Sequence, residues 1–156
     1  MTDQAPNTPS PGASSTPVAV PDNADIVQSF LFALADTDFD TFESLAAPEL
    51  LWQNVGLPSL RGRDRIVKLM RRSAGRMGFA VKFHSIAVEG DTVLTERTDA
   101  IIFGPVRLQF WVCGRFELRD GRITLWRDYF DTVDTVVKAP LKALVGLIIP
   151  SLRPRF

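Results

Sequence analysis

The chain has very few of the side chains on which metal binding and covalent catalysis usually depend. Its 156 residues include one cysteine, one histidine and one tyrosine. The single Cys113 excludes an internal disulfide and a cysteine-built zinc site, and it is compatible with a reducing cytoplasm. A site with several histidine ligands is excluded by the same count. We therefore expect no metal and no other cofactor, and a cytoplasmic protein.

The lone histidine, His84, restricts nucleophilic catalysis further. Any Ser-His-Asp triad or Cys-His pair would have to use it. It stands in AVKFHSIAV, a predicted strand, and the G-x-S-x-G motif does not occur in the chain. This context favours a half-exposed strand residue over a member of a triad.

Positive charge is missing from the first part of the chain, and no apolar run is long. No lysine or arginine precedes Arg61, the remainder is basic, and the formal net charge is zero, which does not indicate nucleic-acid binding. The apolar run LKALVGLIIP is shorter than the roughly 20 residues that cross a bilayer. Attachment of residues 135–149 to a membrane surface is a minor alternative, and we do not expect a membrane protein.

The length and a hydrophobic content of 46% fit one folded domain with a sizeable core. Residues 1–21 contain five of the eleven prolines and have no apolar stretch of the signal-peptide type. We expect a disordered, proline-rich arm at 1–21. Residues 22–156 then form a single domain that ends in an amphipathic segment.

Periodicity and turn residues predict the order of the elements. Helices are expected from Asp22 or Asn23 to Ala35, over 36–48 with closure at Pro48, and over 62–77. Strands are expected at 50–56, 79–89, 92–103, 106–118 and 122–130, with a C-terminal helix from about Thr132. Helices gathered on one side of a curved antiparallel or mixed sheet make an α+β fold with a cone-shaped apolar pocket.

The third helix and the residues just before it carry seven basic side chains, counted from Arg61. Such a face could bind phosphate groups. Because no aromatic or glycine-rich partner accompanies it, we favour a solvated outer face.

Charged residues occur in strands that should be buried. Arg97 and Asp99 are two positions apart and share a strand face, and Asp128 shares its face with Trp126 and Phe130. An Arg-x-Asp pair alone is typical of a structural ion pair. One guanidinium cannot neutralise two carboxylates, however, so a shared site would keep one proton or stay net negative.

Three short motifs now identify a family that the sequence resembles. They are WQN at 52–54, RTDA at 97–100 and WRDYFD at 126–131, and LQFWVCG at 108–114 adds to them. Together with the element order over about residues 24–140, they resemble the limonene-1,2-epoxide hydrolases of the nuclear-transport-factor-2-like superfamily, with mycobacterial-type members most similar.

The resemblance implies a role for each matching residue. Asp99 would be the general acid that protonates the epoxide oxygen, and Asp128 the general base that activates water. Arg97 would bridge the two carboxyls, and Asn54 would accept a hydrogen bond from the water. Trp52 stands where the family has tyrosine; its indole N–H can donate a hydrogen bond but cannot accept one.

The expected substrate is a bulky lipophilic epoxide, cyclic and terpene- or steroid-like, which becomes a vicinal diol. The side chains expected to bind it are Phe103, Phe110, Trp126 and Phe130. Two rival functions are a ketosteroid-isomerase-like enzyme, against which the lack of an inward tyrosine argues, and a non-catalytic module that binds a lipophilic ligand. We also expect a homodimer, formed through the outer face of the 106–118 strand, although the C-terminal helix could cover that face instead.

Overall fold

The computed structural model describes residues 22–131, 140–141 and 144. Its helices and strands follow in the order α1 (Asn23–Ala35), α2 (Phe39–Leu45), β1 (Ala46–Asn54), β2 (Leu60–Arg61), α3 (Arg63–Ser73), β3 (Gly78–Glu89), β4 (Thr92–Phe103), β5 (Val106–Arg119) and β6 (Arg122–Tyr129). The predicted arm at 1–21 and most of the predicted C-terminal helix lie outside the described residues.

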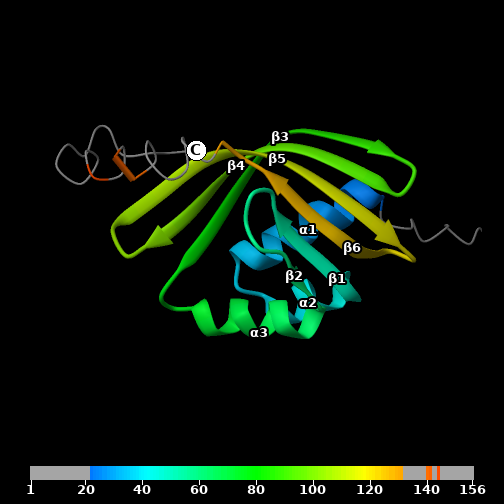
Figure 1. The fold of residues 1–156 in the computed structure, drawn as a ribbon, viewed down its shortest axis with the longest axis horizontal. Helices are drawn as coiled ribbons and strands as arrows, with labels where there is room; N and C mark the ends of the chain where they lie inside the picture. Colours follow the sequence, from blue (N-terminus) through cyan, green and yellow to red (C-terminus); the bar gives the residue numbers. More distant parts are fainter. Residues whose placement is uncertain (1–21, 132–139, 142–143, 145–156) are drawn as a thin grey trace, which may run out of the picture.

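The strands form one mixed sheet with the order β2-β1-β6-β5-β4-β3. All neighbours are antiparallel except β1 and β6, which run parallel. In Figure 1 the long strands β3–β6 arch over the three helices, and the sheet is not closed into a barrel. The predicted α+β class and the helix-covered, curved sheet are confirmed.

The helices cover the concave face of the sheet because each has one apolar stripe. Helix α1 buries Phe30 and Leu31 fully, and Phe30 stacks on Phe42 of α2 with ring centroids 4.2 Å apart. Helix α3 buries Ile66 and Met70. This core occupies one part of the space under the sheet and leaves a cavity in the rest.

Two predicted helix ends were wrong. The second helix stops at Leu45, and Pro48 lies inside β1 rather than closing the helix. The register of β1 on β6 shifts between Ala46 and Leu51, so this proline lies where the ladder is irregular and no regular N–H donor is needed. Helix α3 ends at Ser73, before Gly75 at a φ of +81°, so Met77 lies beyond it.

The four long strands start and end within one residue of the predicted positions, because tight turns with Gly90, Gly104 and Gly121 at positive φ separate them. The two-residue strand β2 was not predicted. It is too short to show any alternation.

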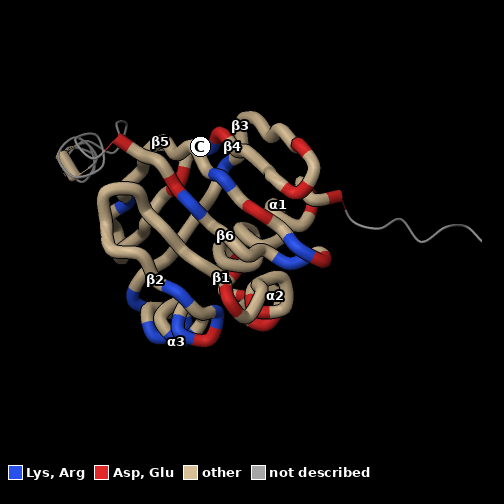
Figure 2. Tube along the Cα trace, turned by 45° about the vertical axis from the view of Figure 1, so that its right-hand side comes forward, with Lys and Arg blue, Asp and Glu red and all other residues tan. Residues whose placement is uncertain are grey.

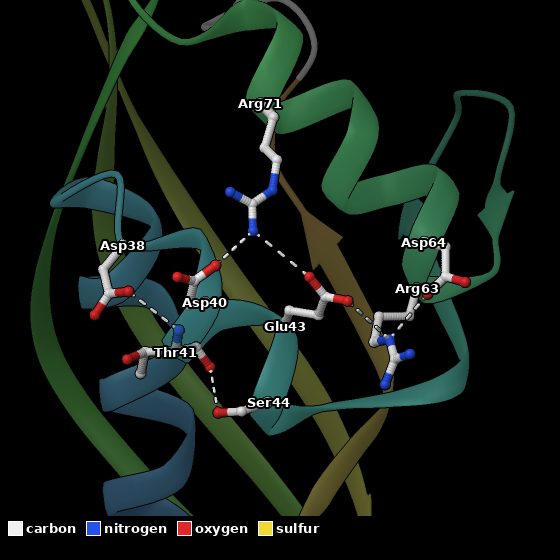
Figure 3. A network of polar contacts seen from close by, with 8 residues as sticks. All are labelled: Asp38, Asp40, Thr41, Glu43, Ser44, Arg63, Asp64 and Arg71. Carbon is white, nitrogen blue, oxygen red and sulfur yellow. Dashed lines mark hydrogen bonds and ion pairs between the residues drawn. The ribbon is translucent and has the colours of Figure 1, made fainter.

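Basic residues of α3 meet acidic residues of α2 along one edge of the molecule (Figure 2). Arg71 pairs with Asp40 at 2.7 Å and with Glu43 at 3.6 Å, and Arg63 Nε lies 3.9 Å from Glu43 Oε1. Figure 3 shows these contacts between the two helices. Solvent screens the charges of such exposed ion pairs, so each pair contributes little to stability. They hold the two helices in register and fit the solvated face expected from the sequence.

Among the described residues, no helix has the length and apolar character that spanning a membrane requires.

Candidate active site

A fully buried arginine, Arg97, lies at the centre of the candidate site. Its Nε donates to Asp99 Oδ1 at 2.9 Å and Oδ2 at 3.1 Å, and its Nη2 donates to Asp128 Oδ1 at 2.5 Å. Its Nη1 donates to Thr95 Oγ1 at 2.9 Å. The predicted Arg97 bridge between the two carboxyls is therefore present in the structure.

Strand geometry brings these groups together. Thr95, Arg97 and Asp99 alternate on β4, so all three side chains point to the concave face. Asp128 reaches the same face from β6, two strands away, across β5. The guanidinium spans the intervening strand at Gly114, which is paired with Thr95 on one side and Asp128 on the other.

The glycine at position 114 makes room for the arginine. A Cβ atom there would lie 2.1 Å from Arg97 Nη1 and 2.6 Å from Thr95 Oγ1. Both atoms belong to a packed, hydrogen-bonded cluster, so neither can move aside cheaply. Only a residue without a side chain fits beneath this guanidinium.

The two carboxyls open into an apolar cavity of about 370 Å³ under the sheet. Its walls come from both the sheet and the helices, and Arg97 lies behind the carboxyls rather than in the lining. Apart from Asp99 and Asp128, the lining consists of Leu34, Thr37, Phe39, Trp52, Asn54, Val55, Gly56, Leu57, Met70, Ser73, Ala74, Met77, Gly78, Phe79, Ile101, Phe110, Val112, Trp126 and Phe130.

The structure brings most of the residues singled out in the sequence to this cavity. Trp52, Asn54, Phe110, Trp126 and Phe130 all line it together with the two carboxyls. The parallel register that pairs Trp52 with Trp126 and Asn54 with Asp128 explains the convergence from β1 and β6.

Phe103 is the exception, and the expectation that it lines the pocket is wrong. Its side chain is 44% exposed and is not part of the cavity wall. It has the same strand parity as Asp99 and Ile101, but it is the last residue of β4, next to the turn at Gly104. Parity alone cannot tell how far along a strand a cavity extends.

The two tryptophans in the cavity wall differ in their hydrogen bonding. Their rings stack with centroids 5.0 Å apart and an interplanar angle of 21°. Trp126 Nε1 donates to Asp128 Oδ2 at 2.7 Å. Trp52 Nε1 is buried and has no hydrogen-bond partner among the described residues.

Burial and charge together determine how the site titrates. Burial raises the pKa of Asp99 to about 6, although the positive charge of Arg97 opposes the rise. Burial also raises the pKa of Asp128, against the charge of Arg97 and the hydrogen bonds from Arg97 and Trp126. The pKa of Arg97 is raised because the two aspartates outweigh its burial, so the guanidinium keeps its charge. One cation beside two buried carboxyls favours a single shared proton.

Thr95 and Gly114 are site residues that the sequence analysis missed. Thr95 has the strand parity of Arg97, which could have indicated it. A glycine inside a strand often marks the close approach of another group. The position of Gly114 within the predicted 106–118 strand could therefore have indicated it.

His84 lies away from the cavity. Its ring stacks on Trp111 with centroids 5.1 Å apart, and its Nε2 is 2.8 Å from Thr98 Oγ1. It lies in a strand, as expected, but it is exposed rather than half-exposed. Among residues 22–131, 140–141 and 144, no group of three or more His, Cys, Asp or Glu side chains is arranged to hold a metal ion.

Comparison with known proteins points to one family. The profile of the limonene-1,2-epoxide hydrolase catalytic domain matches residues 21–141. Epoxide hydrolase EphG of Mycobacterium tuberculosis is 54% identical over 127 residues, which are 81% of this chain and 85% of the relative. A solved LEH-like epoxide hydrolase from M. tuberculosis has a TM-score of 0.83 at 51% identity, and the match covers 86% of this chain and 95% of that one.

A more distant structure shows the wider distribution of the fold. An NTF2-like protein of unknown function from Cytophaga hutchinsonii superposes with a TM-score of 0.61 at 21% identity, over 73% of this chain and 94% of its own. At this identity the likeness extends to the fold alone.

Replacing Gly114 by alanine tests the packing beneath Arg97. The added methyl group must displace the guanidinium from its carboxyl partners, so we expect the free energy of unfolding to fall by about 3 kcal/mol or more in urea titrations. Gly78→Ala is the matched control, because its nearest atom, Ile102 Cβ, is at an ordinary 3.4 Å. A Gly114→Ala protein as stable as wild type would show that the arginine is not closely packed there.

Proposed function

Because the chain belongs to the limonene-1,2-epoxide hydrolase family, we propose that it is an epoxide hydrolase that adds water to a lipophilic epoxide and releases a vicinal diol. The observation that carries this proposal is the pair of buried carboxyls held by one guanidinium at an apolar cavity. Opening an epoxide requires a proton for the departing oxygen and an activated water for the carbon. Two carboxyls that share one proton supply both.

In the proposed reaction Asp99, in its protonated form, is the general acid and donates its proton to the epoxide oxygen. Asp128, in its ionised form, is the general base and takes a proton from the attacking water. One C–O bond breaks as the new one forms, and the product carries two hydroxyl groups. Arg97 keeps both carboxyls oriented toward the cavity throughout.

Asn54 and Trp52 are proposed to position the water. The side-chain oxygen of Asn54 accepts a hydrogen bond from it, and the position of Asn54 beside Asp128 in the β1–β6 register supports this role. Trp52 shapes the wall next to the water. Its indole N–H only donates, so it cannot accept a hydrogen bond from the water as a phenol oxygen could.

The substrate is proposed to be a bulky, apolar, cyclic epoxide of terpene or steroid type. Aromatic rings of Phe110, Trp126 and Phe130 form part of the wall, and Phe110 meets Phe130 edge-on at 5.8 Å. A cavity of about 370 Å³ is within the usual range for small-molecule sites. Turnover that rises from small aliphatic epoxides to cyclic terpene epoxides would support this assignment; the reverse order would contradict it.

An isomerase of the ketosteroid type is the rival enzyme. Tyr129, the only tyrosine in the chain, is 43% exposed on a strand position that alternates with Asp128, so it is not available to the cavity. This observation favours hydrolysis. Formation of a conjugated enone from a β,γ-unsaturated steroid, with no diol from epoxides, would reverse the choice.

We further propose a homodimer, a cytoplasmic location and catalysis without a cofactor. Leu94, Trp111 and Tyr129 leave exposed apolar surface on the convex side of the sheet, which a second copy could cover. Sedimentation as a monomer at assay concentrations would contradict the dimer, and recovery with the membrane fraction would contradict the location. Loss of activity on dialysis against a chelator would contradict cofactor independence.

Removing either carboxyl should abolish most of the activity without unfolding the protein. We expect Asp99→Asn and Asp128→Asn each to lower kcat on the order of 10²-fold or more, because each removes one proton-transfer step. Glu96→Gln is the control, since it makes the same chemical change on the opposite face of β4. Circular dichroism checks folding, and near-wild-type turnover in either aspartate variant would contradict the assignment.

The raised pKa of Asp99, about 6, predicts the alkaline limb of the pH profile. The acid acts only when protonated, so kcat/KM should fall about tenfold per pH unit above this pKa. At lower pH the rate should fall again as Asp128 becomes protonated. A profile that stays flat from pH 6 to 9 would contradict a catalytic proton on Asp99.

A further inference from the structure

The bridge through Arg97 does not explain why one carboxyl should be the acid and the other the base. The guanidinium donates to both, through Nε to Asp99 and through Nη2 to Asp128. Both carboxyls are almost completely buried. Some other group must distinguish them if the shared proton is to reside mainly on one.

Among the described residues, one side chain donates to only one of the two carboxyls without being the shared arginine, and it is an indole. Trp126 Nε1 donates to Asp128 Oδ2 at 2.7 Å, while Arg97 holds the other oxygen of the same carboxylate. Among the described residues, the only side chain that donates to Asp99 is Arg97. An indole N–H donates and never accepts, so it stabilises an ionised carboxylate more than a protonated one.

We propose that Trp126 is a positioning residue that keeps Asp128 ionised and thereby assigns the shared proton of the pair to Asp99. The roles of acid and base rest on the function proposed above. The preference for one protonated carboxyl is a property of the folded protein and does not depend on the substrate.

The indole is held so that its N–H cannot turn away from Asp128. Trp126 is only 3% exposed. Its ring stacks on Trp52 and meets the rings of Phe30 and Phe42 edge-on, with centroids 5.4 Å and 6.3 Å away. Residues from α1, α2 and β1 therefore hold the indole N–H in place as a hydrogen-bond donor to Asp128, the proposed general base.

No other titratable group competes for this role among the described residues that face Asp128. Helices α1 and α2 present aromatic rings to Trp126, while β1 pairs Asn54 with Asp128 and β5 pairs Gly114 with it. Of the cavity-lining residues that the structure describes, Asp99 and Asp128 alone have titratable side chains. The charges that act on Asp128 at close range are thus those of Arg97 and Asp99.

The test is a titration of the aspartate side chains by carbon-13 NMR in the substrate-free protein. Signals of the two carboxyl carbons are assigned with Asp99→Asn and Asp128→Asn. In wild type we expect the carboxyl carbon of Asp128 to keep the chemical shift of an ionised carboxylate at pH 6 to 7, where Asp99 titrates. In Trp126→Phe we expect the pKa of Asp128 to rise by about one unit, a tenfold change in proton affinity.

Trp52→Phe is the matched control. It removes the other indole of the stacked pair, whose N–H has no partner among the described residues. It should therefore leave the titration of Asp128 unchanged, whatever it does to turnover. An unchanged Asp128 titration in folded Trp126→Phe, or an equal shift in Trp52→Phe, would overturn the proposal.

A second measurement on wild type keeps the proposal testable if Trp126→Phe does not fold. In nitrogen-15-labelled protein, the indole N–H signal of Trp126 should move with the titration of Asp128, while that of the exposed Trp111 should not. A Trp126 indole signal whose chemical shift does not change as Asp128 titrates would contradict the proposal. Neither NMR experiment uses an epoxide, so a failed hydrolysis assay and a failed proton assignment are separate results.

Discussion

The structure of the site depends on the burial of one charged side chain, Arg97, between two carboxyls. A guanidinium at 0% exposure is tolerated only because its donors are satisfied by Asp99, Asp128 and Thr95. The ion pairs are short, and Arg97 lies behind the two carboxyls that line the cavity. The same arrangement that makes the buried charge stable leaves the site with one more carboxyl than cation. This excess favours retention of one proton that catalysis can use.

The curved sheet positions these groups with little help from loops. Regular alternation places the side chains of β4 on the concave face, and the glycine of β5 lets the guanidinium span to β6. Helices α1 and α2 contribute the aromatic rings that fix Trp126, and α3 helps to enclose the apolar cavity. Core packing and the proposed chemistry are therefore coupled: the rings that stabilise the domain also orient the hydrogen-bond donor of the general base.

Much of this arrangement could be predicted from the sequence, because it depends on local rules. Alternation placed Arg97 and Asp99 on one face, and turn glycines marked the ends of the long strands. The rest depends on contacts between distant segments. Three features could not be predicted from neighbouring residues in the sequence. They are the irregular β1–β6 register that accommodates Pro48, the space beneath the guanidinium at Gly114 and the end of the cavity before Phe103. The hydrogen bond from Trp126 to Asp128 likewise depends on a side-chain orientation that spacing does not determine.

The central claim is that the two carboxyls act as one acid and one base, so that water attacks the epoxide directly. The alternative is attack by a carboxylate to form an ester that water later cleaves. A single turnover in ¹⁸O-labelled water, with enzyme in excess over a terpene epoxide, separates the two. With direct attack, the first diol released already carries the label, and no label enters Asp99 or Asp128. A first diol with an unlabelled protein oxygen, and label in one of these aspartates, would contradict it.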